Sequence, residues 1–404
     1  MPGERKRVVI TGLGAICALG NSVAEFWRNL TENRSGLKPI TRFDPTGLRN
    51  HLGGEVTDFD FSTWGLGSTA GLDRAAQFAL AAAAEAWRDA GLERETPAAG
   101  RGAVFSTNFG GASSWEGFVE TGDPAAFAAF DFHAAAGRAI VSFGLTGPVV
   151  TLSNACSSGT NALGYAADLI RHGQAEVMLA GGHDALSLSA LSGLSALRTI
   201  TTETIRPFDR NRSGTLFGEG SGMVVLESWE HAQGRGVPIY AEVLGYAANN
   251  NAYHLTAPDR GGEGMRLALR RALADAGLAP EEVDYVNAHA TGTPYHDLAE
   301  TQAIKAVLGP HAYRIPISSL KAATGHVMAA AGALEAIACV LALRDGIVPP
   351  TLNYQTPDPE CDLEVVPNRA QRWEVNVVLS LSAGLGGNNA ALVLGKHLAV
   401  NPGA

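Results

Sequence analysis

Cys156 is a candidate nucleophile, and its sequence neighbours suit that role. It stands between an apolar run, 149–152, and a helix-like run that begins at Ser157. A cysteine at a helix N-terminus lies in the partial positive charge of the helix, which lowers the thiol pKa and favours the thiolate. A lone cysteine is also commonly a buried, inert residue. This segment alone therefore leaves a nucleophile and a core residue as alternatives.

Two later histidines favour the nucleophile. His289 directly follows a predicted strand, 283–288, and His326 lies at the start of a predicted helix. Each histidine alone is readily explained as a structural residue. A thiol and two imidazoles at the ends of predicted elements nevertheless suit acyl transfer through a thioester on Cys156.

Four polar residues accompany these histidines. Lys321 and Glu335 flank His326 in runs that are otherwise small or apolar, which predicts buried supporting positions rather than a solvated surface pair. Thr291 and Thr293 place hydroxyls beside the first histidine, where they suit hydrogen bonds to a polar thiol arm.

A metal site built from His289, His296 and Asp297 is not predicted, because their spacing matches no standard ligand pattern. Asp297 and Glu300 lie on the helix predicted after His289. For these two carboxylates we expect capping and charge pairing.

The elements that must position these residues alternate between strand and helix, which predicts a largely parallel α/β architecture. The run 7–11 is predicted to be a strand that enters a turn at Gly12 and Gly14. The clearest helix is 73–90, followed by Gly91 as its C-terminal stop. In parallel α/β sheets, sites form at the carboxyl ends of the strands, which is where Cys156 lies.

The second part of the chain repeats the first. The runs 239–250, 262–291 and 314–346 repeat, in order, the first strand, the long helix with its following strand, and the Cys156 segment. A period this long indicates a duplicated domain rather than a solenoid. We expect a first half over 1–236 and a second half over 237–404, with His326 near the counterpart of Cys156.

The composition of the chain limits the classes of function that are expected. The chain has 404 residues, 46% of them hydrophobic, and a net charge of −10, which gives no electrostatic indication of nucleic-acid binding. The four cysteines form no CxxC pair, so neither a structural zinc site nor a disulfide framework is expected, and a cytoplasmic location fits best. The apolar run 327–343 contains Glu335 and is shorter than the ~20 residues of a membrane span, so no membrane association is expected.

Four ordered motifs resemble those of the β-ketoacyl-acyl-carrier-protein synthases. These condensing enzymes have a thiolase-like fold, and the resemblance extends from residue 8 to residue 395. It implies a five-layer αβαβα architecture with two pseudo-symmetric halves. The motifs are NACSSGTNA at 154–162, NAHATGTPYHDLAE at 287–300, KAATGHVMAAAGALEA at 321–336 and GLGGNN at 384–389.

The resemblance implies a decarboxylative condensation. Cys156 would accept an acyl chain from an acyl carrier protein. His289 and His326 would promote decarboxylation of malonyl-carrier protein and stabilise the enolate. The carbanion would attack the thioester to give a 3-oxoacyl product. No metal or organic cofactor would be required beyond the phosphopantetheine arm of the carrier.

Further roles follow from the same resemblance. The backbone N–H groups of Cys156 and Leu385 would form the oxyanion hole. Lys321 and Glu335 match the family's supporting pair, and Thr291 and Thr293 match its pantetheine-binding threonines. Residues expected to gate or line the acyl pocket are Leu385, Gly386, Leu194 and Phe109.

Two of these pocket positions depart from the family pattern. Leu385 stands where the fatty-acid enzymes usually carry a phenylalanine in a GFGG loop, and Phe109 stands where they often have a smaller residue. These changes predict an altered acyl preference, such as a rigid or unsaturated chain of a type II polyketide pathway. The housekeeping elongating synthase of fatty-acid synthesis is the alternative. Either a homodimer or a heterodimer with a similar, catalytically silent subunit is expected.

Other function classes fit less well. A silent chain-length-factor partner would lack the cysteine that this chain keeps at Cys156. A thiolase would need a second catalytic cysteine, and Cys361 lies outside any matching motif. A dinucleotide-binding enzyme would need a third glycine where Cys17 stands.

Overall fold

The computed structural model describes residues 5–95 and 100–397. The apolar, β-branched runs of the sequence form one ten-stranded sheet, in the order β10-β9-β13-β14-β8-β1-β7-β6-β4-β5. Its strands are β1 (Val8–Cys17), β4 (Arg101–Ser106), β5 (Val149–Leu152), β6 (Val177–Asp184), β7 (Gly220–Ser228), β8 (Ala241–Asn250), β9 (Tyr285–Asn287), β10 (Ile317–Ser318), β13 (Val377–Gly384) and β14 (Asn388–Gly395).

The sheet consists of two halves with the same topology. Strands from the first part of the chain are ordered β5-β4-β6-β7-β1, and those from the second part β10-β9-β13-β14-β8. Numbered within its own half, each set reads 3-2-4-5-1, so the prediction of two pseudo-symmetric halves is confirmed. The halves meet where β1 pairs with β8, through Val9 with Glu242 and Ile10 with Ala241.

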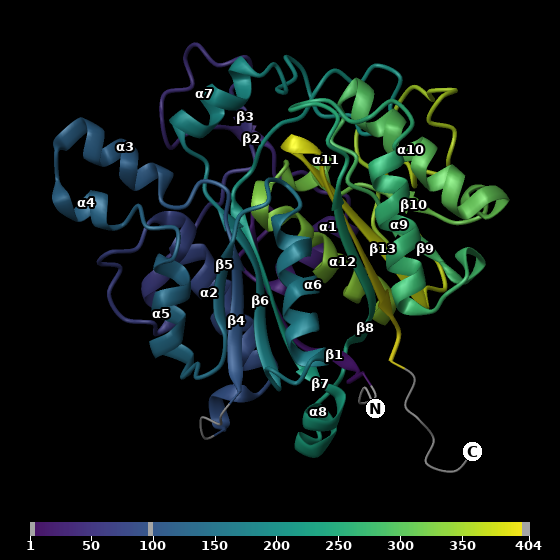
Figure 1. Cartoon of the computed structure of the whole chain (residues 1–404). Coiled ribbons are helices and arrows are strands. Elements are labelled where there is room, and N and C mark those ends of the chain that lie inside the picture. Colours follow the sequence, from purple (N-terminus) through teal and green to yellow (C-terminus); the bar gives the residue numbers. More distant parts are fainter. Residues whose placement is uncertain (1–4, 96–99, 398–404) are drawn as a thin grey trace.

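Helices cover both halves and also lie between them (Figure 1). The central helices α6 (Ser158–Arg171) and α12 (Ala331–Asp345) each contact strands of both halves. Helices α2 (Arg74–Asp89) and α5 (Ala134–Phe143) cover the outer face of the first half, and α9 (Glu263–Ala276) with α10 (Pro294–Leu308) covers that of the second. This is the αβαβα layering that the sequence predicted.

The remaining elements are short or peripheral. They are the helices α1 (Val23–Thr31), α3 (Ala112–Thr121), α4 (Pro124–Ala128), α7 (Leu188–Ala196), α8 (Trp229–Arg235) and α11 (Lys321–Thr324); the 3-10 turns η1 (Phe61–Trp64), η2 (Leu92–Arg94), η3 (Pro280–Glu282), η4 (Gly309–Tyr313), η5 (Met328–Ala330) and η6 (Leu385–Gly387); and the ribbons of β2 (Lys38–Pro39) with β3 (Leu52–Gly53) and β11 (Ile347–Val348) with β12 (Gln371–Arg372).

The predicted turn at Gly12 and Gly14 is wrong, because β1 continues through both residues. A Cβ on Gly12 would lie 2.1 Å from the carbonyl oxygen of Ala86, and one on Gly14 would lie 1.9 Å from that of Ala82. The glycines therefore let α2 pack directly on β1. Helix α2 itself begins as predicted, with the Asp73 side chain accepting the N–H of Ala75.

The sheet is mixed rather than largely parallel. Only β4 with β5 and β6, and β9 with β10 and β13, pair in parallel. β7 and β14 run antiparallel to both of their neighbours. Buried apolar strands have the same composition in either direction, so the sequence pattern did not reveal their orientation.

The apolar run 327–343 forms η5 and most of α12, and it lies between the two halves of the sheet. In the two described ranges, no helix combines the length and the apolar character needed to cross a bilayer. The predicted boundary between residues 236 and 237 falls in the connection between α8 and β8.

Candidate active site

Cys156 lies on a tight elbow between β5 and α6. Ala155 adopts a left-handed backbone conformation with φ of 51°, which turns the chain sharply just before the cysteine. Two serines hold the turn: the Ser157 hydroxyl donates to the carbonyl of Asn154 at 2.8 Å, and the N–H of Asn154 donates to Oγ of Ser158 at 2.7 Å. The elbow therefore presents Cys156 at the N-terminus of α6.

The end of β13 approaches this elbow closely. A Cβ on Gly384 would lie 2.9 Å from the backbone nitrogen of Cys156 and 3.0 Å from Cβ of Ala155, so only glycine fits without displacing the chain. The backbone N–H groups of Leu385 and of Cys156 itself both hydrogen-bond to the Cys156 thiol. Two donors thus converge on the atom to which an acyl group would be attached.

The thiol of Cys156 is not activated as the sequence predicted. Its pKa is raised to about 11, because burial disfavours the thiolate more than the charge of Lys321 and the two N–H groups favour it. The nearby Asp184 carboxylate raises the pKa further. The residue keeps partial exposure, but its sulfur is surrounded by protein. The prediction of a lowered pKa is therefore wrong for the resting chain.

His289 follows β9 and is held by a buried carboxylate. Glu300 accepts the N–H of His289 at 2.7 Å and that of Ala290 at 2.8 Å. The ring of His289 meets that of His326 edge to face, with centroids 5.4 Å apart. The two histidines from different motifs therefore share one site.

His326 is fixed through its backbone. Its N–H donates to the carbonyl of Leu216 at 2.7 Å, and its carbonyl accepts the N–H of Gly218 at 3.1 Å. Its ring stacks on Phe217 with centroids 5.6 Å apart. Both ring nitrogens are buried, and neither has a hydrogen-bond partner among the described residues. These nitrogens are thus available to a bound substrate.

Both imidazoles are neutral at physiological pH. Burial lowers the pKa of His289 and of His326 well below the ordinary histidine value, and the positive charge of Lys321 lowers both further. A neutral imidazole carries one N–H donor, so each ring can donate one hydrogen bond to a developing anion.

Lys321 and Glu335 are buried and form an ion pair, as their apolar surroundings predicted. The pKa of Glu335 is raised by burial, which the charge of Lys321 opposes. Lys321 also favours the Cys156 thiolate and the neutral state of both histidines. The pair acts on the site through its charge, because neither residue lines the cavity.

A cavity of about 420 Å³ brings the candidates together. Its lining includes Cys156, His289, His326, Thr291, Thr293, Leu194 and Leu385. The hydroxyls of the two threonines lie 3.1 Å apart. Gly386 is not in the lining, and its N–H donates to the carbonyl of Leu255 at 2.7 Å.

Phe109 lies outside this cavity. Its N–H donates to Asp184 at 3.1 Å, and its side chain packs against the core cluster that both halves share. A role for Phe109 in acyl selection therefore stays a prediction from the sequence.

The sequence reasoning undervalued one cavity residue, His296. It lines the same cavity, and its ring meets that of His289 edge to face with centroids 4.9 Å apart. The signal was its place on α10 one turn before Glu300, which puts both side chains on one helix face. Asp297, within α10, accepts the N–H groups of Phe208 and Gly292 in the loops beside the helix rather than capping the helix.

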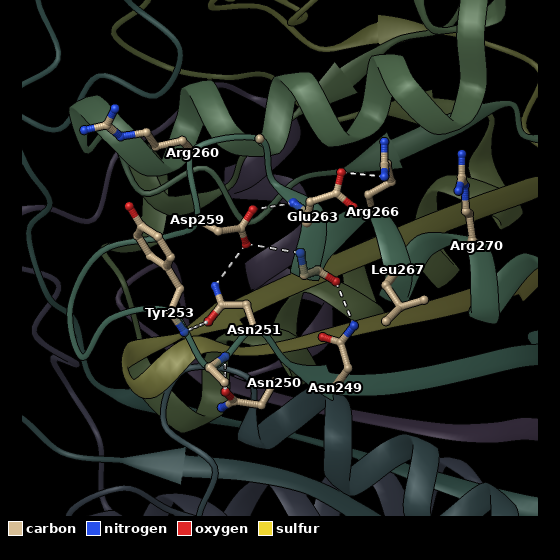
Figure 2. Close-up of a pocket in the computed structure, with 13 residues that line it drawn as sticks. Asn249, Asn250, Asn251, Tyr253, Asp259, Arg260, Glu263, Arg266, Leu267 and Arg270 are labelled. Atoms are coloured by element: carbon tan, nitrogen blue, oxygen red, sulfur yellow. Dashed lines mark hydrogen bonds and ion pairs between the residues drawn. The ribbon is translucent and has the colours of Figure 1, made fainter.

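A second hollow, of about 650 Å³, shares a lining residue with the candidate active-site cavity, and its residues are drawn in Figure 2. Asn251 lines both, and its side chain donates to Asp259 at 3.1 Å. Asn250 donates from its side chain to the carbonyl of Gly386 at 2.7 Å, and the N–H of Asn251 donates to the carbonyl of Gly387 at 3.0 Å. The asparagines of this hollow thus anchor the loop that carries Leu385.

Comparisons with known proteins agree with this geometry. The family model described as "Beta-ketoacyl synthase, N-terminal domain" matches residues 5–232, and "Beta-ketoacyl synthase, C-terminal domain" matches residues 240–355. The chain is 40% identical to 3-oxoacyl-[acyl-carrier-protein] synthase 2 of Coxiella burnetii, covering 97% of this chain and 99% of that protein. It is 42% identical to a putative polyketide β-ketoacyl synthase of Streptomyces halstedii, covering 96% and 98%.

Solved structures agree as well. The ishigamide ketosynthase/chain length factor superposes with a TM-score of 0.93 at 38% identity, covering 98% of this chain and 100% of that one. The type II polyketide ketosynthase complex AntDE:AntF superposes with a TM-score of 0.91 at 36% identity and the same coverage. With two family models and full-length relatives in agreement, the chain belongs to the β-ketoacyl synthase family, condensing enzymes of the thiolase-like fold.

Proposed function

We propose that this chain condenses an acyl thioester on Cys156 with malonyl-acyl-carrier protein, giving 3-oxoacyl-acyl-carrier protein and carbon dioxide. The observation that carries the proposal is the cavity into which Cys156, His289 and His326 all face. Cys156 belongs to the first half of the chain, and His289 and His326 belong to the second. Their convergence on one cavity therefore supports a common chemical role rather than separate structural roles.

The first step transfers the acyl group. The Cys156 sulfur attacks the acyl carbonyl, and the N–H groups of Cys156 and Leu385 stabilise the oxyanion. The bond to the carrier sulfur then breaks, and the carrier thiol leaves with the proton that Cys156 gave up. Lys321 and the N-terminus of α6 stabilise the thiolate while it forms.

The second step breaks the bond between the malonyl carboxylate and its methylene carbon. The released electron pair forms an enolate, whose oxygen accepts hydrogen bonds from the neutral rings of His289 and His326. The carbon attacks the Cys156 thioester, and the Cys156 thiolate leaves and takes up a proton from water. Because loss of carbon dioxide drives the condensation, the proposed reaction needs no metal or organic cofactor. The pantetheine arm would hydrogen-bond to Thr291 and Thr293.

For the substrate, we place the chain in a type II polyketide or specialised fatty-acid pathway. The aliphatic gate residue Leu385 supports this, as does the likeness to the two polyketide ketosynthase structures. Housekeeping fatty-acid elongation is the second candidate, which the identity to 3-oxoacyl-[acyl-carrier-protein] synthase 2 of two bacteria favours. A smaller, non-aromatic gate admits a rigid or unsaturated chain that an aromatic gate would exclude.

Covalent trapping tests both levels of the proposal. Carrier proteins loaded with matched saturated and polyenoic chains are incubated with the enzyme, and the mass of the Cys156 peptide is measured. We expect acylation at Cys156 and faster turnover of the polyenoic chains. Equal or better use of saturated chains would contradict the polyketide assignment. Full condensation activity of Cys156→Ala would contradict the catalytic role of Cys156. It would favour the alternative that this chain is a silent chain-length-factor partner.

The proposed partners are an acyl carrier protein and a second synthase-like subunit, either identical or similar. One related structure is described as an acyl carrier protein in complex with its ketosynthase, and another as a ketosynthase with a chain length factor. The four free thiols suit a reducing compartment such as the cytoplasm.

A further inference from the structure

Four aromatic rings in the lining of the candidate active-site cavity contact one another in succession. Phe217 stacks on His326 with centroids 5.6 Å apart and planes 22° apart. His326 meets His289 at 5.4 Å and 85°, and His289 meets His296 at 4.9 Å and 70°. The ring of His289 therefore contacts the rings of two other histidines.

The ring of His289 depends on these contacts. A catalytic imidazole is commonly oriented by a hydrogen bond from its second nitrogen to a carboxylate or a carbonyl. In His289 that nitrogen, Nδ1, is buried and has no hydrogen-bond partner among the described residues. With no such hydrogen bond, packing alone limits rotation of this buried side chain, and the two neighbouring imidazole rings are part of that packing.

The two ends of this set of rings are held differently. His326 is fixed by its backbone hydrogen bonds and by Phe217. At the other end, α10 carries His296 and Glu300 one turn apart, and Nδ1 of His296, 3.8 Å from Oε2 of Glu300, has no hydrogen-bond partner among the described residues. Glu300 accepts a hydrogen bond from the backbone of His289, and His296 contacts the ring of His289. One helix, α10, therefore contacts both the backbone and the side chain of His289.

Charge does not oppose this contact. Burial lowers the pKa of His296 to about 4, with a smaller contribution from Lys321, so the ring is neutral at physiological pH. Two neutral rings pack edge to face without the repulsion that two imidazolium ions would experience.

We propose that His296 is a positioning residue for the decarboxylation step, holding the ring of His289 so that its N–H points at the enolate oxygen. The inference rests on the proposed condensation. It concerns only the step that uses His289, because the oxyanion of the acylation step is bound by the N–H groups of Cys156 and Leu385. Loss of the His296 ring should therefore separate the two steps.

The test measures both steps in the full-length protein. Carbon dioxide release is followed from malonyl-acyl-carrier protein, and acylation of Cys156 is followed by mass spectrometry with an acyl carrier protein. For His296→Ala we expect kcat for carbon dioxide release to fall about 10-fold, with KM within about twofold. Acylation of Cys156 should stay at the wild-type rate, which also shows that the variant is folded.

His296→Phe is the matched variant, because it keeps a flat ring but binds no proton. We expect it to restore carbon dioxide release to within about threefold of wild type. His172→Ala, at the C-cap of α6 and so at the opposite end of that helix from Cys156, should behave as wild type. If His296→Ala does not fold, His296→Asn removes the aromatic ring with a smaller change in volume and carries the same expectation.

Equal losses in both steps for His296→Ala would overturn the inference, and so would a His296→Phe variant no faster than His296→Ala. An unchanged rate of carbon dioxide release in His296→Ala would overturn it as well. A wild-type enzyme that releases no carbon dioxide from malonyl-carrier protein would instead contradict the proposed function itself.

Discussion

Burial raises the pKa of the Cys156 thiol, and it outweighs Lys321 and the two N–H groups, which lower that pKa. Its pKa of about 11 predicts that alkylation by iodoacetamide is slow near neutral pH and keeps rising to at least about pH 10. A thiol activated by a helix N-terminus alone would reach a plateau near pH 7. The rate is measured by mass spectrometry of the Cys156 peptide, with Cys156→Ala as the blank. A plateau below about pH 8 would contradict the raised pKa.

The ion pair beneath the site makes a second prediction at this scale. Lys321→Met leaves the Glu335 carboxylate buried without its partner, which should lower the free energy of unfolding by about 3 kcal/mol. Adding Glu335→Gln should recover most of that loss. Urea denaturation measures both variants. Lys305→Met, which breaks a more exposed pair with Asp362, is the control and should cost less than about 1 kcal/mol. Similar losses for Lys321→Met and Lys305→Met would sink this account.

At the residue scale, the sequence correctly predicted that two charged side chains are buried, but it did not predict the pKa of the Cys156 thiol. Apolar neighbours in the chain were enough to predict that Lys321 and Glu335 are buried. The pKa of Cys156 was predicted in the wrong direction, because the thiol is buried in a site that Gly384 and Leu385 also form, and these lie more than two hundred residues further along the chain. Local sequence does not encode that enclosure.

At the scale of elements, the contact between β13 and the elbow sets the geometry of the oxyanion hole. Gly384→Ala should push the two apart, since the added Cβ would lie 2.9 Å from the Cys156 nitrogen. We expect Cys156 acylation to slow about 10-fold or more and stability to fall by about 1–3 kcal/mol. Both are measured, by mass spectrometry and by urea denaturation.

The control for that variant is Gly234→Ala in α8. A Cβ there meets no atom within 4 Å, so the substitution should raise stability by about 0.5–1 kcal/mol and leave acylation unchanged. Normal acylation by Gly384→Ala would show that the elbow tolerates displacement and that the close approach is not needed for the reaction.

Elements with a clear period or cap were predictable, and their mutual arrangement was not. The helix 73–90 and the strand before Cys156 appear as α2 and β5. The glycines of β1 resembled a turn because the sequence does not show that a helix packs against them. Strand direction was missed for the same reason, since it depends on which strands become neighbours.

At the scale of the whole molecule, helices α3, α4 and α5 lie together at one side (Figure 1), and they carry several exposed large apolar side chains. Helices α3 and α4 bury no residue of their own, and β5 at the sheet edge is only partly buried. A patch of this kind marks an interface with another chain. The exposed apolar side chains of α3, α4, α5 and the loop between α4 and α5 are Trp115, Val119, Phe127, Phe132, Ile140 and Val141.

We expect the chain to form dimers through this face. Val141, 83% exposed, is the probe: Val141→Asp should shift the protein toward monomer in light scattering after gel filtration. Leu267→Asp, on the exposed side of α9 in the other half, should leave the oligomeric state unchanged. A wild-type monomer, or a Val141→Asp dimer as strong as wild type, would contradict this use of the face.

The repeat and the ordered motifs allowed the overall architecture to be predicted from sequence. The place of β1 between β7 and β8 was not predictable, because it depends on how the two halves meet.

That place has a consequence for how the protein is made. β1 is among the first segments to leave the ribosome, yet its partners β7 and β8 are about 200 residues away in sequence. Its hydrogen-bonding edges stay open through most of translation, when unpaired strands are most prone to aggregate. Pairings this distant also slow folding. The strand that joins the two halves is thus the one that stays unpaired longest during synthesis. A chaperone that binds β1 in this interval would prevent its aggregation.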